Sequence, residues 1–209
     1  MCRKAININT WNRKDHFSFY SQFEEPFTGV TVQLDCTQAY EKAKAQNKSF
    51  FLYYLYRALK AANSIENFRY RIVGKKIFLY DVIHAGPTIG RDDGSFGFAL
   101  IKYEEDEKLF YEKALQVVEE VRASTGLDPS VTGEDVIHFS AVPWLDFTSV
   151  SHARRFSFPD SCPKITFGKM VEENGRKRMA VSIHVHHGLA DGYHVGLFVD
   201  RFQDLLDGE

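Results

Sequence analysis

The sequence predicts a mixed α/β protein in which strands and helices alternate along a single domain. Residues 179–185 place an apolar side chain at every second position, which is the period of a half-buried strand. Apolar residues from 195 to 206 recur instead at helical spacing. The chain has 209 residues, of which 44% are hydrophobic and 26% charged, enough for one sizeable core. No repeat or Pro/Ser-rich linker divides it, so we expect one domain over residues 1–209.

The elements of the first half follow from the same two periods. Thr10 or Asn12 is placed to cap a short helix near the N-terminus. After it we expect a strand at 28–35, where apolar residues take alternate positions, and then a helix that Thr37 caps and that reaches about residue 47. A second helix follows at 51–62, with one apolar face. Strands at 68–73 and 77–82 then flank a Gly-Lys-Lys turn.

The second half continues with three strands and one long helix before the C-terminal strand and helix. The pattern predicts an alternating strand at 95–103, an amphipathic helix at 104–123 with a solvated charged face, a strand at 135–144, and a strand that starts near residue 162. Pro143 stops the strand at 135–144, because proline cannot donate a hydrogen bond to a ladder.

Composition excludes several classes of partner. The formal net charge of -2 gives no electrostatic footprint for nucleic acid or for an anionic membrane. No apolar run is long enough to span a bilayer, and residues 1–15 lack the apolar core of a signal peptide. The three cysteines Cys2, Cys36 and Cys162 are far apart and odd in number, so we expect neither a disulfide framework nor a Cys-x-x-Cys metal site. A cytoplasmic setting is the simplest expectation.

Residues 184–192 read His-Val-His-His-Gly-Leu-Ala-Asp-Gly and hold the main candidate site. The cluster lies where the strand over 179–185 ends and the chain turns into the last helix. Asp191 is placed to cap that helix, since its carboxylate can accept orphan N–H groups of the first turn. His187 shares strand parity with Val185, so we expect its ring on the packed side. A neutral imidazole held between rigid elements can take a proton from a hydroxyl or a thiol.

Two other interpretations of the histidine cluster stay open. In the first, the histidines merely end a strand and Asp191 is a plain helix cap. In the second, His184 and His186 bind a metal, because they share one strand face and imidazole suits zinc. No third ligand follows at a recognisable spacing, which leaves the metal interpretation the weaker one.

The cluster resembles the His-His-x-x-x-Asp-Gly signature of the chloramphenicol acetyltransferases, and is similar to the Asp-His-Arg-x-x-x-Asp-Gly form of the dihydrolipoamide acyltransferases. Three other segments also resemble this family: Trp-Asn-Arg-Lys-Asp-His-Phe-Ser-Phe-Tyr at 11–20, Phe-Ser-Ala-Val-Pro-Trp at 139–144 and Cys-Pro-Lys-Ile-Thr-Phe-Gly-Lys at 162–169. The resemblance implies a two-layer fold, with a mixed, largely antiparallel sheet and helices packed on one face.

The reaction implied by the resemblance is acetyl transfer from acetyl-CoA to an alcohol such as chloramphenicol, with no permanently bound cofactor. His187 would deprotonate the acceptor hydroxyl, and Ser140 would donate to the oxyanion of the tetrahedral intermediate. Arg13 would pair with Asp191 and fix the loop of the base, a role that suits a guanidinium fork. No aspartate adjoins His187, so a backbone carbonyl is expected to set its tautomer.

The resemblance also assigns residues that contact the two substrates. Tyr20 would lie beside the acceptor, Thr166 would organise water at the site, and Lys169 would lie near coenzyme A. Met170 stands where the family can have a tyrosine against the adenine. The family further implies a homotrimer, in which the base of one subunit faces an acceptor pocket supplied largely by its neighbour.

Two segments depart from the drug-modifying enzymes. Residues 23–27 read Phe-Glu-Glu-Pro-Phe and residues 151–155 read Ser-His-Ala-Arg-Arg, where those enzymes are more apolar. These charges either face solvent or line an acceptor pocket more polar than one made for chloramphenicol. The alternatives to chloramphenicol acetylation are therefore CoA-dependent acyl transfer to another alcohol, transfer of another acyl chain, and a non-catalytic ligand-binding trimer of the same fold.

Overall fold

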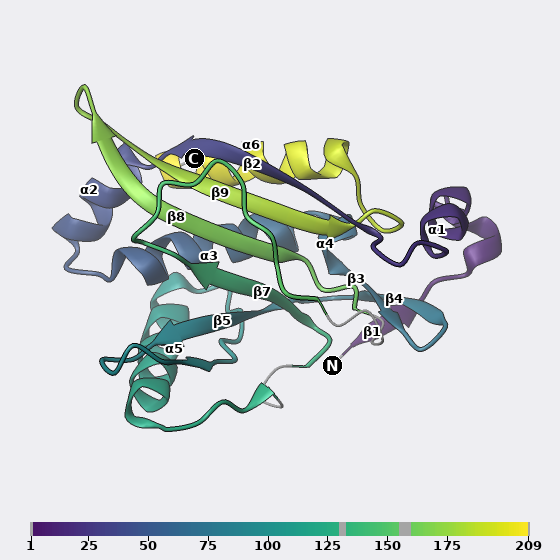
Figure 1. Ribbon diagram of the computed structural model, residues 1–209, viewed down its shortest axis with the longest axis horizontal. Helices are drawn as coiled ribbons and strands as arrows, with labels where there is room; N and C mark the ends of the chain where they lie inside the picture. The colour runs from purple at the N-terminus through teal and green to yellow at the C-terminus, as the bar shows by residue number, and fades with distance from the viewer. Residues whose placement is uncertain (1, 130–132, 155–159, 209) are drawn as a thin grey trace.

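A six-stranded sheet forms the centre of the structure, a computed structural model that describes residues 2–129, 133–154 and 160–208 (Figure 1). The strand order is β2 (Phe27–Asp35), β9 (Arg176–His186), β8 (Lys164–Glu173), β7 (Val136–Ala141), β5 (His84–Gly90) and β6 (Phe96–Phe98). Strand β7 runs parallel to both of its neighbours, whereas the other pairs are antiparallel. The predicted mixed, largely antiparallel sheet is confirmed.

Helices cover one face of this sheet. Figure 1 shows α2 (Thr37–Ala45), α3 (Phe50–Asn63) and α6 (Gly192–Asp207) behind the strands, while α5 (Glu107–Ala123) packs on α3 and on β5 and β6. The core between the layers takes every second residue of the central strands, including the fully buried Phe139, Ile165 and Ile183. Because side chains alternate across a strand, residues 138, 140, 164, 166, 182 and 184 point to the opposite face.

That opposite face is polar. Strand registers align Ser140, Thr166 and Ser182 in one row, and His138, Lys164 and His184 in the next row. The segment that follows β7 crosses this face in front of β8 and β9 before the chain re-enters β8 (Figure 1). Residue 155 of the polar segment noted above lies outside the described residues. The sheet therefore separates an aromatic core from a layer rich in polar side chains.

A second, small sheet braces the N-terminal segment. It has the order β1 (Arg3–Ala5), β4 (Lys76–Tyr80) and β3 (Tyr70–Val73), next to η1 (Ile8–Thr10), α1 (Lys14–Tyr20) and α4 (Glu66–Arg69). Arg71 links it to the main sheet. This fully buried guanidinium donates to the carbonyls of Phe68, Tyr70, Glu134 and Val136 over 2.6–2.8 Å. A buried arginine satisfied by four carbonyls fixes the start of β7 relative to β3.

The structure differs from the sequence-based elements in several places. Helix α1 has Arg13 rather than Thr10 or Asn12 at its N-cap, and α2 has Cys36 at its N-cap, with the predicted cap Thr37 as its first residue. Strands β1 and β5 were not predicted; β5 contains Gly86 and Pro87 and has no alternating pattern. The expected strand at 95–103 shortens to β6, after which Ile101 makes one isolated bridge to Ala85. The first two residues of the expected strand at 68–73 belong to α4 instead. The long helix starts at 107 rather than 104, because the Asp106 side chain accepts from the Leu109 N–H at 2.7 Å and so caps it.

The three cysteines are all unpaired thiols, as expected. No helix in the described part of the chain has both the length and the apolar content of a membrane span.

Replacing Arg71 with methionine should lower the free energy of unfolding by about 3 kcal/mol or more, because several buried carbonyls would lose their donor. Urea unfolding followed by circular dichroism measures the change. Arg122→Met is the matched control, since that arginine is exposed on α5 and its ion pair with Glu119 is solvated. Equal unfolding midpoints for the two variants would contradict the bracing role.

Candidate active site

The backbone of His187 is fixed between two strands and a turn. Strand β9 ends at His186, whose carbonyl accepts from the N–H groups of Leu189 and Ala190 at 2.8 and 3.0 Å. The His187 N–H then donates to the Pro26 carbonyl at 2.8 Å, just before β2 begins. The histidine therefore stands at a tight turn anchored to the edge strand of the sheet.

The His187 ring lies flat against Tyr20 of α1. The two ring centroids are 4.0 Å apart and the planes differ by 7°. The ring is half-buried rather than packed into the core, because the strand ends one residue earlier and its alternation no longer applies. Its Nδ1 is buried and has no hydrogen-bond partner among the described residues, so the expected carbonyl contact is not made. Tyr20 thus lies beside the predicted base, and its contact with the acceptor, which the resemblance implies, stays a prediction.

Arg13 clamps the loop that carries His187. Its side chain is buried and donates through Nη1 to Asp191 Oδ2 at 2.8 Å, through Nη2 to the His187 carbonyl at 3.1 Å and through Nε to the Gly188 carbonyl at 3.4 Å. The predicted ion pair between Arg13 and Asp191 is thus formed. One guanidinium fixes both the residue that bears the imidazole and the start of the next helix.

Asp191 caps α6 as the sequence predicted. Its Oδ1 accepts from the Tyr193 N–H at 3.1 Å and lies 2.7 Å from His194 Nδ1. Partial burial of the Asp191 carboxyl opposes its ionisation, but hydrogen bonds from Arg13 and His194 outweigh that penalty and lower its pKa to about 2. The carboxylate is therefore charged at neutral pH and acts as a structural anion.

Ser140 and Thr166 face each other on the polar side of the sheet, away from His187 in the same chain. Their Cα atoms are register partners, and Thr166 is in turn paired with Ser182. Ser182 precedes His187 by five residues, which is about 16 Å along a strand. Ser140 lies two strands away from Ser182, which is about 10 Å across the sheet. The separation is roughly 19 Å by this geometry. The Thr166 hydroxyl is buried and has no partner in the described part of the structure.

Lys169 is exposed in the middle of β8, at the irregularity in the pairing with β9 between Phe167 and Met170. Its N–H donates to the Leu145 carbonyl at 2.8 Å, which places it beside the segment of Trp144, a side chain 77% exposed. Lys169 therefore lies with the Ser140 end of the sheet rather than with His187.

His184 and His186 belong to no group of three possible metal ligands among the described residues, so the zinc interpretation is not supported. His186 Nδ1 accepts from the Gly188 N–H at 3.2 Å, and His184 Nε2 lies 3.0 Å from the Ser182 hydroxyl. Among the described residues, the group with metal-binding potential is a different one: His138, Asp160 and Cys162, whose ligand atoms lie within 4.8 Å of one another. The Lys164 ammonium is 2.5 Å from the Asp160 carboxylate and already supplies a cation there.

Sequence reasoning missed His138, Asp160 and Lys164. The signal was present for two of them, because Lys164 precedes Thr166 by two residues and His138 precedes Ser140 by two, which places each pair on one strand face.

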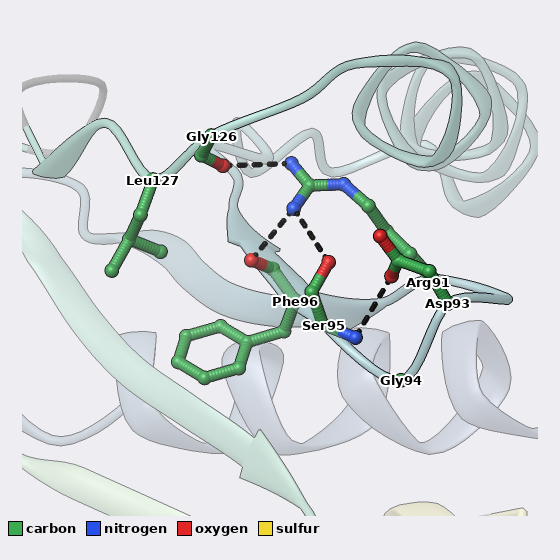
Figure 2. Close-up of a pocket in the computed structure, with 7 residues that line it drawn as sticks. All are labelled: Arg91, Asp93, Gly94, Ser95, Phe96, Gly126 and Leu127. Carbon is green, nitrogen blue, oxygen red and sulfur yellow. Dashed lines mark hydrogen bonds between the residues drawn. The ribbon is translucent and has the colours of Figure 1, made fainter.

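A hollow of about 530 Å³ lies at the edge of the sheet, beside β6 (Figure 2). Arg91 holds its two walls together by donating to the carbonyls of Phe96 and Gly126 at 2.8 and 3.1 Å. Phe96 and Leu127 give it apolar surface. None of the predicted catalytic residues of the same chain lines it.

Comparison with known proteins identifies relatives over almost the whole chain. The family model described as chloramphenicol acetyltransferase matches residues 1–203. Chloramphenicol acetyltransferase 3 of Escherichia coli is 27% identical over 98% of this chain and 97% of the relative. A solved structure of a chloramphenicol acetyltransferase superposes with a TM-score of 0.91 at 32% identity, covering 98% of this chain and all of the other. A probable dihydrolipoamide acetyltransferase of Listeria monocytogenes shares the fold, with a TM-score of 0.69 at 16% identity over 97% of this chain and 92% of the other.

Replacing Asp191 with asparagine should lower the melting temperature at pH 7, because the Arg13 guanidinium loses its anionic partner. Folding lowers the pKa of this carboxyl, so the unfolded chain binds more protons as the pH falls below about 4. The stabilisation is therefore complete above that pH and is lost as the pH approaches 2. Thermal melts of both proteins at pH 7 and pH 3 should show a gap that narrows in acid; equal melting at pH 7 would contradict the clamp.

Proposed function

The chain belongs to the chloramphenicol acetyltransferase family, and we propose that it transfers the acetyl group of acetyl-CoA to an alcohol hydroxyl, with chloramphenicol as the first acceptor to test. The observation that carries the proposal is the clamped loop at the end of β9. Arg13 and Asp191 hold one half-exposed imidazole, His187, against Tyr20. A base held in this way can meet a substrate hydroxyl without reorganising.

In this reaction His187 removes the proton of the acceptor hydroxyl as its oxygen attacks the thioester carbonyl of acetyl-CoA. The Ser140 hydroxyl donates a hydrogen bond to the oxyanion that forms. Collapse of the tetrahedral intermediate breaks the C–S bond, and the imidazolium returns the proton to the departing thiolate. The Thr166 hydroxyl, which has no hydrogen-bond partner among the described residues, is available to hold a water molecule beside the same oxyanion. Lys169 contributes a positive charge toward coenzyme A.

We further propose that the site is completed between subunits of a homotrimer. His187 and Ser140 of one chain are roughly 19 Å apart by strand geometry, too far for both to contact one reacting carbonyl. A head-to-tail interface that closes into a ring would bring His187 of one subunit to Ser140 of the next. Exposed aromatic side chains at both places support an interface: Phe19 and Phe23 pack on Tyr20, which stacks on His187, and Trp144 follows Ser140 in the chain.

Replacing His187 with alanine should lower kcat by a factor of about 10²–10⁴, the usual contribution of a general base, with an unchanged fold. Release of the CoA thiol, measured with acetyl-CoA and chloramphenicol, gives the rate. His16→Ala is the matched control, because this histidine is exposed on α1. Wild-type turnover in His187→Ala would refute the assignment.

Mixing two inactive variants tests the shared site. Ser140→Ala should lose about 10²–10³ in kcat, the cost of one oxyanion donor. When Ser140→Ala and His187→Ala subunits are unfolded and refolded together, about a quarter of the head-to-tail interfaces should pair an intact histidine with an intact serine. Activity should therefore return far above that of either variant alone. Each variant refolded by itself is the control, and no recovery in verified mixed trimers would show that one chain supplies both groups.

A further inference from the structure

Four charged side chains form a connected group on the polar face of the sheet: Glu25, Arg154, Asp160 and Lys164, here called the charged layer. Arg154 Nη1 lies 2.6 Å from Glu25 Oε1, and Arg154 Nε lies 3.8 Å from Asp160 Oδ2. Asp160 in turn accepts from the Lys164 ammonium at 2.5 Å. The group thus joins the two segments, 23–27 and 151–155, that depart from the drug-modifying relatives.

Within one chain the charged layer extends from the His187 end of the sheet to the rows of side chains beside Ser140, which in the proposed trimer belong to two different sites. At one end, Glu25 adjoins Pro26, whose carbonyl holds the His187 N–H. At the other end, Lys164 precedes Thr166 by two residues on the same face of β8, and its register partner His138 occupies the equivalent place before Ser140. An alcohol that binds beside Ser140 of a subunit would therefore lie next to the Lys164 end of that subunit's charged layer.

Several polar atoms in this region are buried without a hydrogen-bond partner among the described residues. They are Arg154 Nε, His152 Nε2 and the Thr166 hydroxyl. The His152 ring meets His184 edge to face at 4.7 Å, which places its free nitrogen in the same layer. Unsatisfied buried donors cost free energy, so they favour a ligand or a water that supplies acceptors.

The charged layer itself carries two positive and two negative charges. Its cations are Arg154 and Lys164, with the guanidinium of Arg71 behind them, against the two carboxylates of Glu25 and Asp160. The histidines add no charge at neutral pH, because burial lowers the pKa of both His138 and His152 to about 4. The partner of Arg154, Glu25, has a half-exposed side chain, so an incoming anion can compete with it for the guanidinium.

We propose that the charged layer selects the acceptor, and that the preferred substrate is a small hydrophilic alcohol bearing a carboxylate or a comparable anionic group, which Arg154 binds. This inference rests on the proposed acetyl transfer and narrows its substrate class. An anionic group supplies an acceptor for Arg154 Nε, whereas a large apolar alcohol would desolvate the charged layer without supplying one. Chloramphenicol is then a poor acceptor compared with an alcohol that carries an acid.

The test compares alcohols with and without an anionic group. Acetyl transfer to 3-hydroxybutyrate is measured against transfer to its methyl ester, and transfer to glycerol 3-phosphate against transfer to glycerol. The wild-type enzyme should favour an anionic member by about tenfold in kcat/KM, the effect of one charge-assisted hydrogen bond. Arg154→Gln should bring the ratio close to one, mainly through KM, while Arg154→Lys should keep a several-fold preference.

Three further measurements separate the possible outcomes. Arg122→Gln, an exposed arginine on α5, should leave the ratio unchanged. Glu25→Gln should raise kcat/KM for the anionic acceptor by removing its competitor. Calorimetric binding of the same alcohols to wild type and Arg154→Gln does not depend on turnover, so a binding preference without thiol release would refute acetyl transfer while supporting the selection. A wild-type ratio at or below one in both pairs, or an undiminished ratio in folded Arg154→Gln, would overturn it.

Discussion

The contact on which the site depends is the fork of Arg13 around the loop at the end of β9. A half-exposed histidine at a strand end has little packing to hold it, so its position must come from hydrogen bonds made by the backbone. Arg13 supplies them to the carbonyls of His187 and Gly188 and to the Asp191 carboxylate. The same carboxylate starts α6, whose buried Phe198 and Phe202 belong to the core. The position of His187 and the docking of α6 therefore depend on the same Asp191 carboxylate.

The central sheet gives its two faces different tasks. The face toward the helices is aromatic and aliphatic, and it supplies the stability that lets the other face be polar. On that other face, hydroxyl, imidazole and charged side chains occupy adjacent rows of the register. Burying so many polar groups is costly unless they are paired. Their retention beside Ser140 and Thr166 is consistent with recognition of a polar substrate rather than with folding alone.

The sequence predicted the parts of the molecule that depend on local patterns and on family motifs. The strand, loop and cap around His187 and Asp191 were anticipated, and so was the Arg13 pair, through the resemblance. Strand β5 was not, since it is buried without alternation. Only part of the charged layer could be predicted from the sequence. Its polar segments stood out, but the contact between Glu25 and Arg154 joins positions 129 residues apart, and no local period encodes such a contact.

The segment between β7 and β8 contributes Arg154 and Asp160 without supplying any part of the Arg13 clamp. Substitutions in that segment can therefore alter recognition while leaving the geometry of the proton acceptor intact. Because of this division, the acceptor preference can change independently of the base. Exchanging the segment between β7 and β8, together with residues 23–27, offers a route to new substrates by directed evolution or by divergence of gene copies. The catalytic frame would be inherited unchanged.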